Sequence, residues 1–123
     1  MGMIIDGKLR TAEDYYYAAF IFQHGVNSDD YRLAHSLATI AYALDPKFEG
    51  AGWLVAATWD RLLVSYNKPQ WYGTQFYSVS AEGVHGEIKL REMDYSAVTD
   101  DERSKLSVPT VNEAKEVILK MNK

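Results

Sequence analysis

One segment of the sequence, residues 48–66, constrains the fold more than any other. It reads FEGAGWLVAATWDRLLVSY, a helical pattern that is apolar around nearly its whole circumference from Trp53 to Val64. Such a helix is stable in water only when other elements cover it on several sides. The sequence therefore predicts that this helix is central and buried.

Two charged residues, Asp60 and Arg61, lie inside this apolar helix. A charge removed from water is costly unless it is paired and hydrogen-bonded. Adjacent residues of a helix point about 100° apart, so these two cannot easily satisfy each other. Each is therefore expected to find its partner elsewhere in the chain.

Two helices are predicted before this segment. Thr11 can cap a helix over residues 12–24, which Gly25 would end. Residues 15–22 are apolar or aromatic all round, so we expect this helix to be covered on more than one side. Ser28 and an Asp pair open a second helix, residues 29–44, which stops at an Asp-Pro dipeptide.

The second helix is amphipathic. Its apolar positions are Leu33, Leu37, Ile40 and Leu44, and beside them runs a stripe of small residues, Ala34, Ala38 and Ala41. Small residues at contact positions suit close helix packing, and helix, Asp-Pro turn and helix resemble a tetratricopeptide-type hairpin. No second copy follows at a fixed period, so a repeat array is not predicted.

The remainder of the chain mixes strand and helix patterns. Residues 74–80 and 86–94 alternate with the two-residue period of strands, which predicts a short β-hairpin near 75–93. Thr99 can cap a short helix or turn over residues 98–106. Thr110 and Glu113 form a capping box for a C-terminal helix, whose expected buried face is Val111, Ala114, Val117, Ile118 and Met121. We predict one mainly α (α+β) domain, residues 1–123, with three antiparallel N-terminal helices and a loose segment at residues 1–10.

Composition excludes several classes of function. A formal charge of −4 and a pI near 5.3 argue against a nucleic-acid partner. The chain has no cysteine, so thiol chemistry and thiolate metal sites are excluded. No apolar run is long enough to span a membrane, and no signal peptide is visible, which favours the cytoplasm. No GxSxG, HExxH, P-loop or dinucleotide motif occurs, and neither a metal site nor a cofactor is predicted.

His24 has two interpretations. It falls in the last turn of the first helix, where it could bind end carbonyls or favour the helix dipole. Alternatively it is a general acid–base oriented by Asp60. His35 is expected to pack at the surface, and His85 to lie exposed in the hairpin turn.

The loop after the central helix is dense in polar and aromatic residues. Gly73 permits a backbone geometry that other residues resist. Gln70 and Gln75 offer donors and acceptors, either to hold a planar polar ligand or to pin the backbone. Asp60 is the candidate cap for the turn formed by Tyr72, Gly73, Thr74 and Gln75.

Three segments, DYYYAAFIFQHG, WLVAATWDRLL and KPQWYGTQF, together resemble a family of bacterial domains that has no assigned reaction. The later VTDDERSKLSVP is similar to a further segment of that family, with Ser107 where glycine is common. The resemblance implies that one set of residues forms a shared signature: Gln23, His24, Asp60, Arg61, Gln70, Tyr72, Gly73, Thr74, Gln75 and Arg103.

Two hypotheses for the function follow. In the first, a polar pocket binds a small anionic molecule: Arg61 pairs with it, Gln70 and Gln75 position it, and His24 with Asp60 performs acid–base hydrolysis or isomerisation. The other signature residues, Gln23, Tyr72, Gly73, Thr74 and Arg103, would line that pocket. In the second, a tetratricopeptide-like domain binds a peptide or protein, and the polar signature is a buried structural network. The oligomeric state is not indicated.

Overall fold

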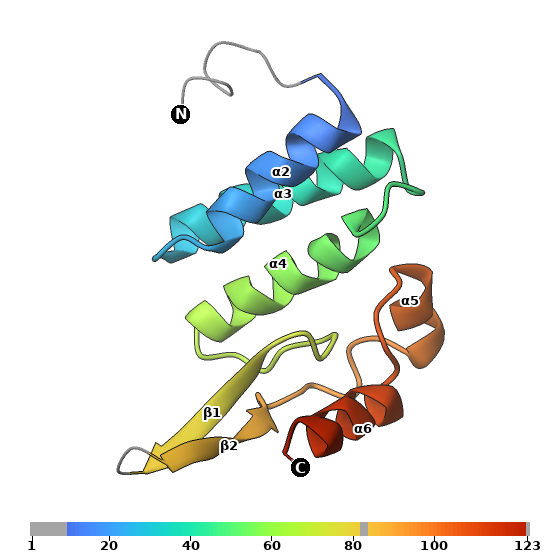
Figure 1. Cartoon of the computed structure of the whole chain (residues 1–123). Coiled ribbons are helices and arrows are strands. Elements are labelled where there is room, and N and C mark those ends of the chain that lie inside the picture. Colours follow the sequence, from blue (N-terminus) through green and yellow to red (C-terminus); the bar gives the residue numbers. More distant parts are fainter. Residues whose placement is uncertain (1–9, 82–83, 123) are drawn as a thin grey trace.

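The computed structural model describes residues 10–81 and 84–122 (Figure 1). These residues form α2 (Ala12–Gln23), α3 (Ser28–Leu44), α4 (Ala51–Ser65), β1 (Phe76–Ala81), β2 (Val84–Leu90), α5 (Asp100–Lys105) and α6 (Val111–Met121). The predicted mainly α class with a short β-hairpin is confirmed. The loose segment expected at residues 1–10 lies, except for Arg10, outside the described residues. No helix in the described ranges is long and apolar enough to cross a membrane.

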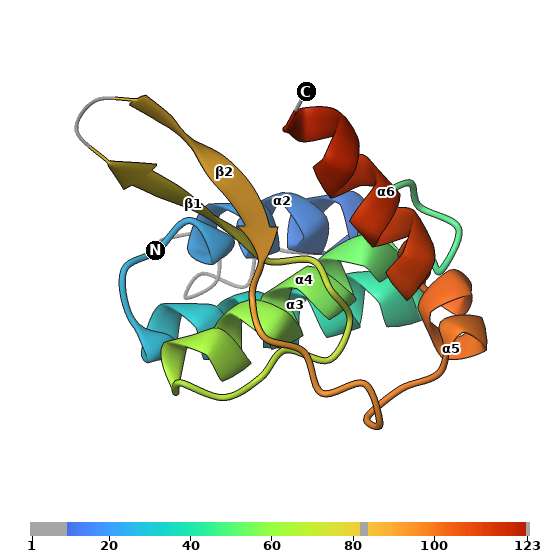
Figure 2. The ribbon, with the colours of Figure 1, turned by 90° about the horizontal axis from the view of Figure 1, so that it is seen from below.

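Helices α2, α3 and α4 stack in one layer, and successive helices run antiparallel (Figure 1). The hairpin, α5 and α6 lie on the other side of α4, which Figure 2 shows from below. α4 therefore lies between α3 and the C-terminal half. The prediction of a central helix is confirmed, and more than half of the residues of α4 are buried.

The helix starts follow their capping residues. Thr11 caps α2 and accepts a hydrogen bond from the backbone N–H of Asp14 at 3.1 Å. α3 is capped by Asn27 rather than by Ser28, and the Asn27 Oδ1 accepts from the N–H of Asp30 at 2.9 Å. The predicted capping residues Thr99 and Thr110 cap α5 and α6 in the same way.

The alanine stripe of α3 lies in the core of the helical layer. Ala34, Ala38 and Ala41 are fully buried, and Ala38 belongs to a core cluster with Ala19 of α2 and Leu54 of α4. Small side chains let the three helices approach closely, so this interface depends on volume more than on large apolar groups. The outer end of the predicted apolar face is open, because Leu44 is 54% exposed.

Two expected burial patterns were wrong. α2 is the outermost helix in the described part of the chain, and its residues Tyr17, Phe20 and Ile21 are exposed. α6 buries Ala114 but leaves Val117 and Met121 exposed. Among the described elements β2 is the one that α6 contacts most, so much of the apolar face of α6 has no cover from the helical layer.

The hairpin is held to α6 by one side chain. β1 and β2 pair antiparallel, with Phe76 opposite Leu90. The Oδ1 of Asn122 accepts from the backbone N–H of Ile88 at 2.7 Å, and its Nδ2 donates to the Ile88 carbonyl at 3.0 Å. The amide thus mimics a neighbouring strand and occupies part of the free edge of β2.

We predict that Ala38→Leu lowers the free energy of unfolding by about 1–3 kcal/mol, because the helices must separate to admit the larger side chain. The matched control is Ala43→Leu, at an exposed position of the same helix, with an expected change of at most about 0.5 kcal/mol. Urea denaturation measures both. Equal effects from the two variants would show that the stripe is not a tight interface.

Candidate functional site

The carboxylate of Asp60 is fully buried and is bound by the loop that follows α4. Its Oδ1 accepts from the backbone N–H groups of Trp71 at 2.8 Å and Tyr72 at 3.0 Å. Its Oδ2 accepts from the N–H of Thr74 at 3.1 Å and from the Thr74 hydroxyl at 2.7 Å. A carboxylate has about four lone-pair positions, and these four donors fill them.

Two effects act on the ionisation of Asp60. Burial raises the pKa of its carboxyl above the ordinary value, while the hydrogen bonds from Thr74, Tyr72 and Trp71 oppose that rise. Each of these donors points at a carboxylate oxygen and favours its charged form. With its acceptor positions occupied, Asp60 serves as the cap of the loop, the structural alternative in the sequence analysis, and has no position free for a substrate.

Gln70 closes the same loop from the other side. Its side chain is fully buried: Oε1 accepts from the Gln75 N–H at 2.8 Å, and Nε2 donates to the carbonyls of Gln75 and Arg91, both at 2.9 Å. Gly73 has a φ of 84°, in the left-handed region, and a Cβ there would lie 3.3 Å from the Met93 side chain. The loop is therefore fixed at both ends and at its turn.

Arg103 ties α5 to this loop. Its side chain is buried, and it donates to the carbonyl of Trp71 at 2.9 Å and pairs with Asp100 at 3.1 Å. Asp100 also accepts from the backbone N–H of Val111 at the start of α6. Arg103 was predicted as a ligand-binding residue, but its contacts join three segments of the C-terminal half.

His24 is not placed against Asp60. Its Nδ1 lies 2.9 Å from the carbonyl oxygen of Phe20, its ring packs beside the Phe20 ring, and the side chain is exposed. This arrangement matches the first of the two interpretations, in which His24 binds a carbonyl at the end of the helix. The neighbouring Gln23 is buried and donates to the carbonyl of Ala57 at 3.3 Å, a contact that links α2 to α4. In the described ranges no three His, Asp or Glu side chains are grouped to hold a metal ion.

Arg61 differs from the other signature residues. Its guanidinium carbon lies 4.8 Å from the centre of the Tyr31 ring, and its Nη2 is 3.4 Å from the Tyr31 hydroxyl oxygen. Its Nε is buried without a hydrogen-bond partner among the described residues. Of the carboxylates in that part of the chain, none forms an ion pair with Arg61.

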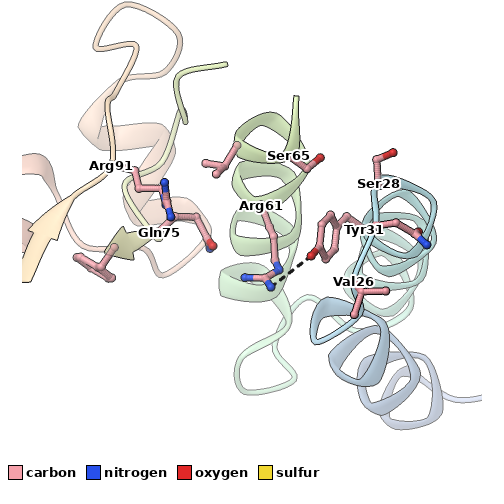
Figure 3. Close-up of a pocket in the computed structure, with 10 residues that line it drawn as sticks. Val26, Ser28, Tyr31, Arg61, Ser65, Gln75 and Arg91 are labelled. Atoms are coloured by element: carbon pink, nitrogen blue, oxygen red, sulfur yellow. Dashed lines mark hydrogen bonds between the residues drawn. The ribbon is translucent and has the colours of Figure 1, made fainter. Parts of the chain in front are cut away.

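A cavity of about 440 Å³ opens beside Arg61 (Figure 3). Its lining comes from the start of α3, the second half of α4 and the base of the hairpin, and consists of Val26, Asn27, Ser28, Tyr31, Arg61, Val64, Ser65, Gln75, Phe76 and Arg91. This lining holds two arginines and no Asp, Glu or His. The cavity is therefore a positively charged site with neutral polar and apolar walls.

The start of α3 adds a partial positive charge to the cavity. The N-terminal end of a helix carries the positive end of its dipole, and Asn27 and Ser28 lie there. Two carboxylates in the same turn are engaged elsewhere: Asp30 accepts from the N–H of Val26 at 3.1 Å, and Asp29 pairs with Arg32 at 3.7 Å.

Of the predicted site residues, only Arg61 and Gln75 line this cavity. Asp60, Gln70, Thr74 and Arg103 form the buried network instead. Tyr72 and Gly73 belong to the loop that this network holds. Tyr31 and Arg91 line the cavity but were not predicted from the sequence. Arg91 lies inside the alternating segment 86–94, a signal that could have placed it on the hairpin.

Comparisons with protein-family models, curated proteins and solved structures gave no significant match. The resemblance to a bacterial family and to tetratricopeptide hairpins therefore stays a prediction.

We predict that Asp60→Ala lowers the free energy of unfolding by about 3–5 kcal/mol, because three backbone N–H groups and the Thr74 hydroxyl lose their acceptor inside the protein. The control is Asp101→Ala, at an exposed position of α5, with at most about 0.5 kcal/mol expected. Chemical denaturation gives both values. A loss below about 1 kcal/mol for Asp60→Ala would contradict the role of Asp60 as the cap of the loop.

His35 gives a pH-dependent prediction. Its Nδ1 lies 3.0 Å from the Thr58 hydroxyl and its ring packs on Trp59; burial lowers the pKa of His35 below its ordinary 6.5. The unfolded chain therefore binds this proton more readily, and stability falls as the pH drops below 6.5. In His35→Gln, the free energy of unfolding should therefore depend less steeply on pH between about pH 5 and 8. An unchanged pH dependence would contradict a lowered pKa of His35.

Proposed function

We propose that this domain binds a small anionic molecule in the cavity beside Arg61. The observation that carries the proposal is the half-buried guanidinium of Arg61, which faces the cavity with no carboxylate partner in the described residues.

The energetics of Arg61 favour an external anion. A guanidinium withdrawn from water loses hydration, and its unpaired Nε adds to that cost. The contact with the Tyr31 ring returns about 0.5–2 kcal/mol. Hydrogen bonds between an arginine and a carboxylate or phosphate are roughly twice as strong as neutral ones. A bound anion would therefore compensate the part of the desolvation cost of Arg61 that the Tyr31 ring does not.

The neutral residues of the cavity suit an organic ligand. Its volume of about 440 Å³ lies within the range of ligand pockets and exceeds the needs of a bare ion. Asn27, Ser28, Ser65 and Gln75 offer hydrogen-bonding groups that could orient such a molecule. Val26, Val64 and Phe76 provide apolar surface for its carbon atoms.

The proposal keeps the anionic ligand but not the catalytic pair. Asp60 has its acceptor positions filled by the loop, and His24 bonds to the carbonyl of Phe20. The cavity itself has neither a histidine nor a carboxylate to act as a general base. A binding domain is therefore better supported than a hydrolase or isomerase.

The alternative hypothesis, a buried structural network, is compatible with this proposal. The network of Asp60, Gln70, Thr74 and Arg103 holds the loop from which Gln75 reaches the cavity. The structural part of the second hypothesis thus has support, whereas peptide binding by a tetratricopeptide-like surface has no specific contact in its favour.

We predict saturable binding of sodium acetate or phosphate, followed by two-dimensional NMR of backbone amides at constant ionic strength. The largest shifts are expected at Ser28, Ser65 and Gln75. Arg61→Gln should weaken binding about tenfold or more, as expected when a charge-assisted hydrogen bond is lost.

The matched control is Arg32→Gln. Arg32 lies outside the cavity, pairs with Asp29 and contacts Tyr66, so its replacement should leave the affinity unchanged. If neither anion saturates the wild-type protein, the proposed function is wrong. Equal weakening by the two substitutions would indicate only a general effect of net charge.

A further inference from the structure

We infer that the ligand carries two separated anionic groups, one bound by Arg61 and the other by Arg91. This inference rests on the proposed function and specifies the chemical class of the ligand: a short organic dianion, of which an unbranched dicarboxylate is the simplest member.

The two arginines belong to different walls of the cavity. Arg61 projects from α4, whereas Arg91 directly follows β2. In Figure 3, Arg61 lies beside Tyr31, and Arg91 lies beyond Gln75 on the hairpin side.

Each guanidinium contacts an aromatic ring of its own. The Cζ of Arg61 lies 4.8 Å from the centre of the Tyr31 ring, and the Cζ of Arg91 lies 5.3 Å from the centre of the Tyr77 ring. Cation–π contacts of this kind favour the observed side-chain positions. The two rings belong to different elements, Tyr31 to α3 and Tyr77 to β1, so each cation has its own support and the arrangement suits two anionic groups better than one compact group.

The backbone of each arginine is also fixed. Arg61 lies within α4, and the helix is anchored on either side of it by the buried residues Asp60 and Leu63. The N–H of Arg91 donates to the Gln75 carbonyl at 3.1 Å, and its carbonyl accepts from the Gln70 Nε2 at 2.9 Å. The buried network therefore fixes the backbone from which Arg91 extends before a ligand binds, which lowers the entropy cost of binding.

The surface shared by the two arginines is uncharged. It includes Val64, Ser65, Gln75 and Phe76, which can contact a neutral carbon chain and any hydroxyl group on it. A monocarboxylate would leave one of the two cations without a partner. A compact ion such as phosphate would leave much of the cavity unfilled.

The experiment is isothermal titration calorimetry, at constant ionic strength, with succinate, glutarate and adipate. Each diacid is compared with its monomethyl ester, and orthophosphate serves as the compact anion. We expect at least one diacid to bind about tenfold or more tightly than its ester, since the second carboxylate adds a charge-assisted contact. The affinity should also depend on chain length, because a carbon chain that is too short cannot place one carboxylate on each arginine.

The variants separate the two contacts. Arg91→Gln, at an exposed position, should bring the preferred diacid close to the affinity of its ester, while Arg32→Gln should bind both like the wild type. The Arg91→Gln comparison decides the question even where Arg61→Gln proves unstable.

Two results would overturn the inference and leave the proposed function intact. One is equal affinity for diacid and ester, with binding still lost in Arg61→Gln. The other is tightest binding of orthophosphate with no dependence on diacid length, which indicates a single compact anion site. Absence of binding by every anion tested would overturn the inference and the proposed function together.

Discussion

The buried carboxylate of Asp60 is the interaction on which the C-terminal half of the molecule depends. Four donors from the loop after α4 converge on it, and three of them are backbone N–H groups. Removing such an acceptor costs more than the hydrogen bonds themselves contribute, because the donors stay buried. The loop in turn leads into β1 and therefore determines where the hairpin lies against α4.

Asp60 and Arg61 are neighbours in sequence with different tasks. Because adjacent helical residues point in different directions, Asp60 faces the loop and Arg61 faces the cavity. The scaffold and the candidate site are thus joined at one turn of α4. The same network that satisfies Asp60 also fixes the backbone of Arg91 through Gln70.

The elements of this fold could be predicted from local signals, since caps, breakers and periodicity act within a few residues. The burial of α2 and α6 could not be predicted in this way, because neighbouring elements cover the apolar residues of these two helices only in part. The same limit applies to the site. Asp60 could be assigned to the nearby loop, but the contact of Arg61 with Tyr31 depends on how α3 packs on α4. Arg91 reaches the cavity only after the hairpin docks. Of the two interpretations of His24, the one that pairs it with Asp60 depends on how α2 is oriented relative to α4, which the local sequence does not specify.

Asp60 receives its hydrogen bonds from within the protein, whereas we propose that Arg61 pairs with a bound anion. A crystal structure determined with saturating succinate tests both parts together. The expected result is a carboxylate oxygen about 3 Å from the Arg61 guanidinium, with Asp60 still bound by Trp71, Tyr72 and Thr74. An empty cavity, or a protein carboxylate paired with Arg61 in place of the ligand, would contradict the claim.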